Sequence, residues 1–267
     1  MTRFAFGENW RSYLATLDER RLVEVARSLA ESVGMERLDG KRFLDVGSGS
    51  GVVSLAARRL GAEVISFDFD NEAVACAREL RSRFFNDDPG WDIRQGSVLD
   101  REFLAGLGMF DVVYAWGVLH HTGSMREALM RVCLSVRTGG RLCVSVYNDE
   151  GWVSRVWRVV KYGYNRCPRF LRWIPLSTAF LRVWGPTMIR DAGRGRPFAT
   201  WRNYHVGRGM SPWHDLVDWV GGYPFEVARP DEIEVFFTSR GFRLIHRVLS
   251  DGRGCNEFLF VLETGKQ

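Results

Sequence analysis

A short apolar run that ends in a glycine-rich turn constrains this 267-residue chain more than any other feature. Residues 42–46 (RFLDV) have the character of a strand, residues 47–51 are GSGSG, and the following VVSLAARRL has the composition of a helix. A strand, a glycine turn and a helix in that order bring backbone N–H groups close to a ligand. The order therefore predicts an α/β fold with a ligand site at this turn.

Strand-like and helix-like segments alternate along the rest of the chain, which predicts a parallel sheet covered by helices on both faces. A final helix is expected at 230–240, and residues 242–250 and 256–263 are expected to pair as an antiparallel hairpin at one edge. Apolar spacing also predicts an N-terminal helix at 11–33. Further strands are expected at 62–67, 91–95, 110–115 and 141–147, and further helices at 52–60, 71–85 and 125–136.

Charge and tryptophan concentrate in one segment. Residues 151–230 hold 13 Lys and Arg against 4 Asp and Glu, together with seven of the ten Trp, although the whole chain carries only +5. This shift predicts an N-terminal flap at 1–40, a core at 41–150 and 230–267, and an inserted basic, Trp-rich substrate lid at 151–229. At the start of the insert, Trp152, Val156 and Trp157 share a helical face with Val153 and Val160. Such a helix can pack on the core, clamp an anionic substrate or lie on a membrane.

The residues around the glycine turn narrow the choice of ligand. Val52 stands where a dinucleotide site has Gly or Ala, which disfavours NAD, and no Lys-Ser/Thr pair follows to form a phosphate loop. Asp68 ends the next strand, 17 residues after Gly51, where a carboxylate can bind both hydroxyls of a ribose. Asp45 precedes the turn and can orient it. This combination suits a cationic nucleoside without phosphate, namely S-adenosylmethionine (SAM).

With these motifs, the chain resembles the class I SAM-dependent methyltransferases. The matching stretches are LDVGSGSG (44–51), VISFDFD (64–70), QGSVLD (95–100), FDVVYAWGVLHH (110–121) and RTGGRLCVSV (137–146). Within that family it is similar to the small-molecule branch that includes the quinone-biosynthesis O-methyltransferases. The resemblance implies a Rossmann-like seven-stranded sheet of order 3-2-1-4-5-7-6, with strand 7 antiparallel and a mostly helical lid inserted after strand 5.

The resemblance also implies roles for individual residues. The glycine turn would lie along the methionine part of SAM, Asp68 would hold the ribose, Phe69 would cover the adenine, and Trp116 would stand beside the reacting methyl group. The cofactor-binding residues expected in this way are Asp45, Gly47, Ser48, Gly49, Gly51, Asp68, Phe69, Ser97, Val98 and Trp116.

Methyl transfer to oxygen needs a base, and two histidines follow the fourth strand. We expect His121, ahead of His120, to take this role, because His is the side chain most often used for proton transfer near neutral pH. Either histidine could instead cap the following turn or pack against the glycine turn. Residues of the insert expected to line the acceptor site are Tyr204, His205, Arg208, Trp213 and His214.

The function predicted from the sequence is O-methylation of a small acidic, sugar-derived, phenolic or lipid-linked acceptor. The alternatives are methylation of tRNA or rRNA through the basic insert, and SAM binding without methyl transfer. The mixture of basic residues with Trp and Pro disfavours nucleic acid. No metal site is predicted, and the sequence assigns no oligomeric state. Five scattered cysteines and the lack of a long apolar run predict a cytoplasmic protein, with the insert able to contact the inner face of the membrane.

Overall fold

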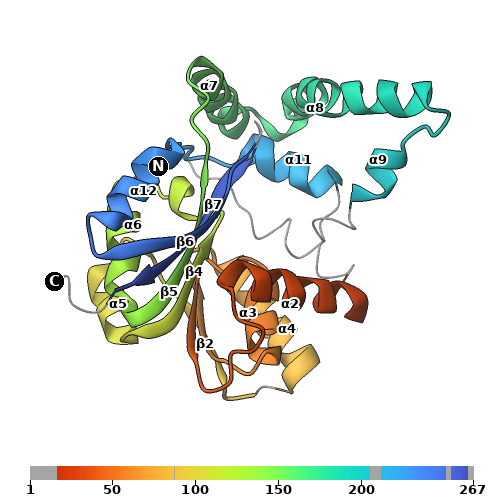
Figure 1. Ribbon diagram of the computed structural model, residues 1–267. Coiled ribbons are helices and arrows are strands. Elements are labelled where there is room, and N and C mark those ends of the chain that lie inside the picture. Colours follow the sequence, from red (N-terminus) through yellow and green to blue (C-terminus); the bar gives the residue numbers. More distant parts are fainter. Residues whose placement is uncertain (1–16, 87, 205–211, 251–253, 264–267) are drawn as a thin grey trace.

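Seven strands form a single sheet in the computed structural model, which describes residues 17–86, 88–204, 212–250 and 254–263 (Figure 1). The strand order is β3-β2-β1-β4-β5-β7-β6, and β7 is antiparallel to both of its neighbours. The predicted topology is therefore confirmed. The strands are β1 (Arg42–Val46), β2 (Glu63–Asp68), β3 (Trp91–Gln95), β4 (Phe110–Trp116), β5 (Val136–Tyr147), β6 (Phe242–Val248) and β7 (Cys255–Leu262).

Helices cover both faces of the sheet, and each face has its own hydrophobic cluster. Neighbouring strand residues point to opposite sides, so in β1 Phe43 packs with the first cluster and Leu44 with the second. One face carries α2 (Glu19–Val33), α3 (Val52–Arg59) and α4 (Asn71–Phe85), and the other carries α5 (Arg101–Leu107), α6 (Met125–Leu134) and α12 (Pro230–Thr238).

Two helix boundaries differ from the sequence predictions. Helix α2 begins at Glu19, because Asp18 accepts a hydrogen bond from the backbone N–H of Arg21 and so caps the first turn, while residues 11–16 of the predicted helix lie outside the described residues. Helix α6 ends at Leu134, and β5 already begins at Val136, which pairs with Phe110 of β4. Residues 137–140 form an irregularity within β5, between the pairing of Val136 with Phe110 and that of Arg141 with Val112, so the strand begins earlier than the predicted 141. Helix α5 was not predicted.

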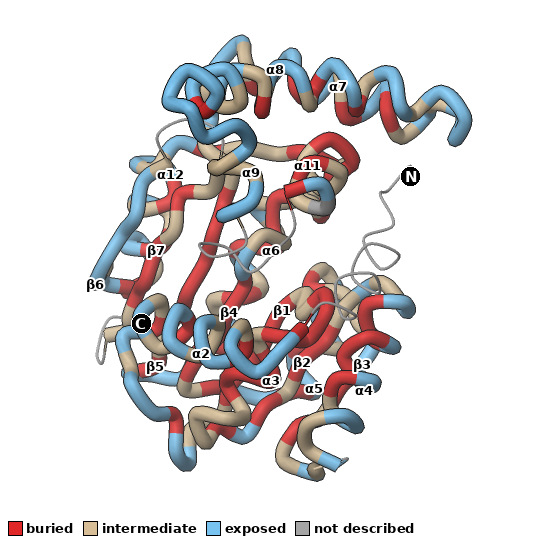
Figure 2. Tube along the Cα trace, turned by 90° about the vertical axis from the view of Figure 1, so that its right-hand side faces the viewer, coloured by how far each residue is buried: buried red, intermediate tan, exposed pale blue. Residues whose placement is uncertain are grey.

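The insert after β5 is mostly helical, as predicted, and lies beyond the carboxyl end of β5 in both views (Figures 1 and 2). It has a third hydrophobic cluster, built around Trp157, Tyr164, Leu216 and Phe225. None of the described helices is both long and apolar enough to cross a bilayer. The elements of the insert are α7 (Trp152–Arg166), η2 (Arg169–Leu171), α8 (Trp173–Gly193), α9 (Ala199–Arg202) and α11 (Pro212–Gly221).

Helix α7 buries only part of the face that the sequence pattern marked, since Val153 and Val160 pack beside Trp157 against the third cluster. Trp157 is buried, but Trp152 and Val156 are 70% and 50% exposed. The buried stripe instead runs through Trp157, Lys161 and Tyr164, at the spacing of successive helical turns. A second apolar stripe consequently points outward. A helix that only covers a core needs one apolar stripe, and its other side is ordinarily polar.

Candidate active site

The glycine turn between β1 and α3 is built for close backbone approach. Gly47 and Gly51 have φ of 68° and 81°, a region that other residues rarely adopt. A Cβ atom on Gly47 would lie 2.5 Å from a methyl carbon of Val118, and one on Gly51 would lie 2.8 Å from the Cβ of Ala77. Glycine is therefore required here by both backbone conformation and space.

Asp68 is held beside this turn by backbone donors. Its two carboxylate oxygens accept hydrogen bonds from the N–H groups of Gly49 and Asp70, each at 2.9 Å. Burial raises the pKa of Asp68, while these N–H donors act in the opposite direction. Each oxygen keeps a further lone pair, so the carboxylate can still accept from a pair of ligand hydroxyls.

Asp45 lies on β1 and is buried under the turn. It accepts a hydrogen bond of 2.6 Å from the hydroxyl of Ser54, which attaches α3 to β1. Burial raises the pKa of Asp45 from its ordinary value to about 7. In the structure this carboxylate positions the helix that follows the turn, and its predicted role toward the ligand stays a prediction.

The remaining cofactor-binding residues predicted from the sequence lie at or just after the carboxyl ends of β2, β3 and β4. Phe69 and Trp116 present rings that are 58% and 45% exposed. Val98 is buried, and the hydroxyl of Ser97 accepts a hydrogen bond from the N–H of Leu99 at 3.2 Å. An exposed aromatic ring directly after Asp68 is what an adenosine needs next to its ribose, so the residues present fit the predicted nucleoside.

The segment that carries the two histidines contacts the glycine turn. Val118, whose side chain abuts Gly47, leads directly into the short helix η1 (Leu119–His121). His121 and the glycine turn are therefore attached to the same short segment after β4. This segment is in turn fastened to β5 by a hydrogen bond of 2.8 Å from the N–H of Gly117 to the hydroxyl of Ser145.

His121 has a defined tautomer. Its Nδ1 lies 2.7 Å from the carbonyl oxygen of Pro224, and a carbonyl can only accept, so Nδ1 carries the proton. In neutral His121 the basic nitrogen is thus Nε2. The backbone of Gly222 passes so close that a Cβ there would lie 2.7 Å from Cε1 of His121. The segment 222–224 of the lid therefore fixes both the position and the tautomer of this ring.

His120 has different surroundings. Its ring is completely buried, and neither nitrogen makes a hydrogen bond of normal geometry to the described residues. It packs against the ring of Tyr147, with centroids 4.0 Å apart. Burial lowers the pKa of His120 well below its ordinary 6.5, so the ring is neutral. An acceptor that enters from solvent cannot contact a ring enclosed in this way. This favours His121 over His120 as the base.

The acceptor residues predicted in the insert are only partly described. Tyr204 donates a hydrogen bond from its hydroxyl to the carboxylate of Asp215 and packs edge-on against Trp184. Trp213 is 46% exposed at the start of α11. Predicted residues that lie outside the described residues are His205, Arg208 and the side chain of His214.

The sequence reading missed an aromatic group beneath the lid. Tyr147 at the end of β5, Trp219 and Phe225 surround the ammonium of Lys161 from α7, with their ring centroids 5.6, 4.3 and 4.8 Å away. Lys161 is completely buried and donates to the carbonyl of Trp219. The position of Tyr147 at the carboxyl end of a parallel strand was the available signal. The other members come from distant parts of the chain.

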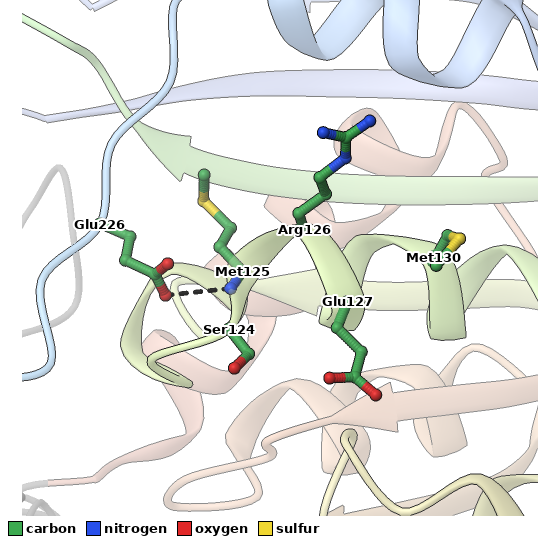
Figure 3. Close-up of a pocket in the computed structure, with 6 residues that line it drawn as sticks. All are labelled: Ser124, Met125, Arg126, Glu127, Met130 and Glu226. Atoms are coloured by element: carbon green, nitrogen blue, oxygen red, sulfur yellow. Dashed lines mark hydrogen bonds between the residues drawn. The ribbon is translucent and has the colours of Figure 1, made fainter.

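A shallow hollow lies nearby, at the start of α6 (Figure 3). Glu226 accepts a hydrogen bond of 3.0 Å from the N–H of Met125 at its rim, and the backbone N–H of Glu226 donates to the carbonyl of His120. The hollow contains none of the predicted site residues. Its lining residues are Ser124, Met125, Arg126, Glu127, Met130 and Glu226.

Comparison with known proteins identifies the family. A family model described as a methyltransferase domain matches residues 17–246. The chain belongs to the class I SAM-dependent methyltransferases. This methyltransferase is 28% identical over 141 residues to a ubiquinone biosynthesis O-methyltransferase of Nitrobacter winogradskyi, a match that covers 53% of this chain and 49% of that one. It is 33% identical over 157 residues to a tRNA U34 carboxymethyltransferase of Pseudomonas paraeruginosa, covering 58% and 45%.

The methyltransferase spans about half the length of these curated relatives. Among solved structures, it is similar to magnesium protoporphyrin IX methyltransferase from Synechocystis with bound S-adenosylhomocysteine. That match has a TM-score of 0.53 and 15% identity, and covers 90% of this chain and 82% of the other. At this identity the likeness confirms the fold.

Proposed function

We propose that this methyltransferase transfers the methyl group of SAM to an oxygen atom of a small-molecule acceptor that binds between the glycine turn and the lid. The observation that carries the proposal is the single short segment, 116–121, that abuts Gly47 at one end and presents His121 at the other. A donor held by Asp68 and an acceptor held near His121 would thus be positioned by one rigid connection, and alignment supplies much of the acceleration in such displacements.

The residues divide the work in a simple way. When bound, SAM supplies an electrophilic methyl carbon, whose bond to sulfur breaks as the acceptor oxygen bonds to it, with sulfur keeping the electron pair. Asp68 and the ring of Phe69 would hold the adenosine. Nε2 of His121 would accept the proton that the acceptor hydroxyl loses, while Pro224 keeps the proton on Nδ1. The lid would exclude water from this exchange.

The chemistry of the insert supports an acceptor that is anionic or linked to a lipid. Eight Lys and Arg residues and no Asp or Glu occur between residues 151 and 190, on the elements that follow β5 directly. Arginine offers a planar fork to carboxylate or phosphate groups. RNA is the second candidate acceptor, because relatives such as the Pseudomonas paraeruginosa protein carry tRNA in their name.

We expect the variants D68N and H121N to separate cofactor binding from chemistry. D68N should lose most binding of S-adenosylhomocysteine in calorimetry, because it replaces the carboxylate that would hold the ribose. H121N should keep that binding but lower transfer of labelled methyl groups by about 10²–10⁴-fold, as expected for loss of a general base. The matched control is H246N, since His246 lies exposed on β6.

Offering the enzyme different mixtures of acceptors distinguishes small-molecule methylation, RNA methylation and SAM binding without transfer. Transfer to a small-molecule extract and not to total tRNA supports the proposal, and transfer to tRNA alone would replace it with the RNA function. If S-adenosylhomocysteine binds and no pool accepts a methyl group, the chain is a SAM-binding protein without transfer. Equal losses in H121N and H246N would remove His121 from the mechanism.

A further inference from the structure

The outer layer of the lid has an unusual surface. Of the 22 large hydrophobic side chains that are exposed among the described residues, ten lie between residues 151 and 190. The same forty residues contain no acidic side chain and eight basic ones, of which only Lys161 is buried. Scattered exposed apolar side chains are normal on a soluble protein, but such a concentration on adjoining elements marks an interaction surface.

Helix α7 contributes a continuous stripe to this surface. Trp152, Val156 and Val159 are 70%, 50% and 70% exposed and follow one another at helical spacing on the side away from the lid's own core. Arg155 and Arg158 are exposed beside them. The inner side is already occupied by the buried Trp157, Lys161 and Tyr164. The outer stripe is therefore additional to what folding of the lid requires.

The next elements also carry exposed apolar side chains. Phe170 in η2 and Trp173 at the start of α8 are 76% and 64% exposed, and Leu181 and Ile189 further along α8 are 66% and 76% exposed. Figures 1 and 2 show α7 and α8 as the outermost layer at one end of the molecule, and the colours of Figure 2 show exposed positions along this layer. We call these exposed residues of α7, η2 and α8 the outer lid face.

We propose that the outer lid face docks on the surface of a bilayer that contains anionic lipid. Tryptophan, phenylalanine and leucine side chains partition into the boundary between headgroups and acyl chains, and arginines beside them bind the lipid phosphates. RNA would be attracted by the same arginines, but contacts with phosphates leave no role for exposed Leu181 and Ile189. The absence of any carboxylate from residues 151–190 removes the repulsion that an anionic surface would otherwise meet.

Docking in this way would also orient the active site. Helix α7 follows β5 directly, and its Lys161 reaches the same aromatic group as Tyr147, which packs on the histidine pair. The acceptor side of the site would then lie close to the membrane, so the acceptor would be lipid-linked. This second step rests on the proposed function, whereas membrane docking does not.

The test is binding of the full chain to vesicles of phosphatidylcholine alone and of phosphatidylcholine mixed with phosphatidylglycerol. We expect sedimentation with the mixed vesicles only. Quenching of tryptophan fluorescence by brominated lipid should show that the rings enter the bilayer boundary. The double variant W152S/W173S should lose this quenching and bind at least tenfold more weakly, whereas L134S/V235S, which alters two equally exposed residues on α6 and α12, should bind like the parent.

Charge variants separate lipid from RNA. Each arginine near an anionic surface contributes about a fivefold gain in affinity, so R155Q/R169Q should weaken vesicle binding by more than tenfold, and the control R78Q/R101Q, which changes two exposed arginines of α4 and α5, should not. Lack of binding to mixed vesicles, or equal binding by W152S/W173S, would overturn the proposal. Binding of total tRNA that depends on Arg155 and Arg169, without vesicle binding, would assign the outer lid face to RNA instead.

Each variant's binding of S-adenosylhomocysteine serves as the folding control. Vesicle binding and methyl transfer, measured on the same protein, distinguish the two proposals. Vesicle binding by a protein that transfers no methyl group would leave docking intact and refute the proposed function. Methyl transfer to a water-soluble acceptor by a protein that does not bind vesicles would support the proposed function and refute membrane docking.

Discussion

At the residue scale, the surroundings of Lys161 are the least expected in the molecule. A lysine on a basic helix is ordinarily solvated, yet this one is fully buried with its ammonium facing three aromatic rings. Asp218 and Cys255 are the ionisable groups that favour the charged form of Lys161. The charge of Lys161 in turn contributes to lowering the pKa of His120. Burial outweighs these and lowers the pKa of Lys161 from 10.5 to about 7.

This pKa predicts how stability depends on pH. Between pH 7 and 10.5 the unfolded chain binds a proton at Lys161 that the folded chain does not, so folded stability rises with pH across this range. We expect K161M to raise the free energy of unfolding by about 1–4 kcal/mol at pH 7, because it replaces a buried charge with an apolar chain of similar size. The gain should shrink as pH approaches 10.5.

Urea unfolding of K161M and the parent at pH 7 and 9.5 checks this expectation. The matched control is K41M, which removes a lysine that is only partly buried before β1. A gain for K161M that is unchanged or larger at pH 9.5 would contradict the assigned pKa.

At the element scale, the glycine turn depends on two separate requirements that substitution can distinguish. Gly47 and Gly40 have φ of 68° and 65°, but only Gly47 faces a close neighbour, Val118, whereas Gly40 has open space. We expect G40A to cost about 1 kcal/mol for its left-handed backbone. G47A should cost more, because the turn must shift away from Val118.

Binding of S-adenosylhomocysteine gives the second measurement on these variants. G47A should bind at least tenfold more weakly, since the N–H groups of Gly47 and Ser48, which donate to the carbonyl of Phe67 in β2, would move. G40A should bind like the parent. Similar behaviour of the two variants would mean that contact with Val118 does not position the turn.

At the scale of the whole molecule, the lid has its own hydrophobic cluster, and it contacts the core where Trp219 and Phe225 pack on Tyr147 and Pro224 binds His121. We expect W157A to destabilise the lid by about 3–5 kcal/mol, since it removes the largest buried side chain of α7. W152A, which removes an exposed ring from the same helix, should change stability by less than about 0.5 kcal/mol.

Hydrogen exchange can locate the effect of W157A. Amides of α7 and α11 should exchange faster while those of β1 and β4 stay protected, and S-adenosylhomocysteine should still bind. Methyl transfer should fall, because Pro224 no longer holds His121. Loss of protection throughout the sheet would show instead that lid and core unfold together.

Local sequence was sufficient for the core of this protein. The glycine turn, Asp68 and the alternation of strands and helices are short-range patterns, and backbone sterics allow few structures that satisfy them. They predicted a parallel sheet with a ligand site at the glycine turn, and the resemblance that these motifs carry implied the family and the strand order. Tertiary structure alone decided the environments of His120 and His121, because Tyr147, Gly222 and Pro224 come from distant segments.

The same distinction explains the lid. Composition showed a basic, Trp-rich insert, but helical periodicity by itself does not state which stripe of α7 turns inward. Trp152 and Trp157 have the same chemistry, and only packing against Trp219 and Phe225 buried one and left the other exposed. Burial is a property of contacts between distant segments, so the outer lid face became visible only in the folded chain.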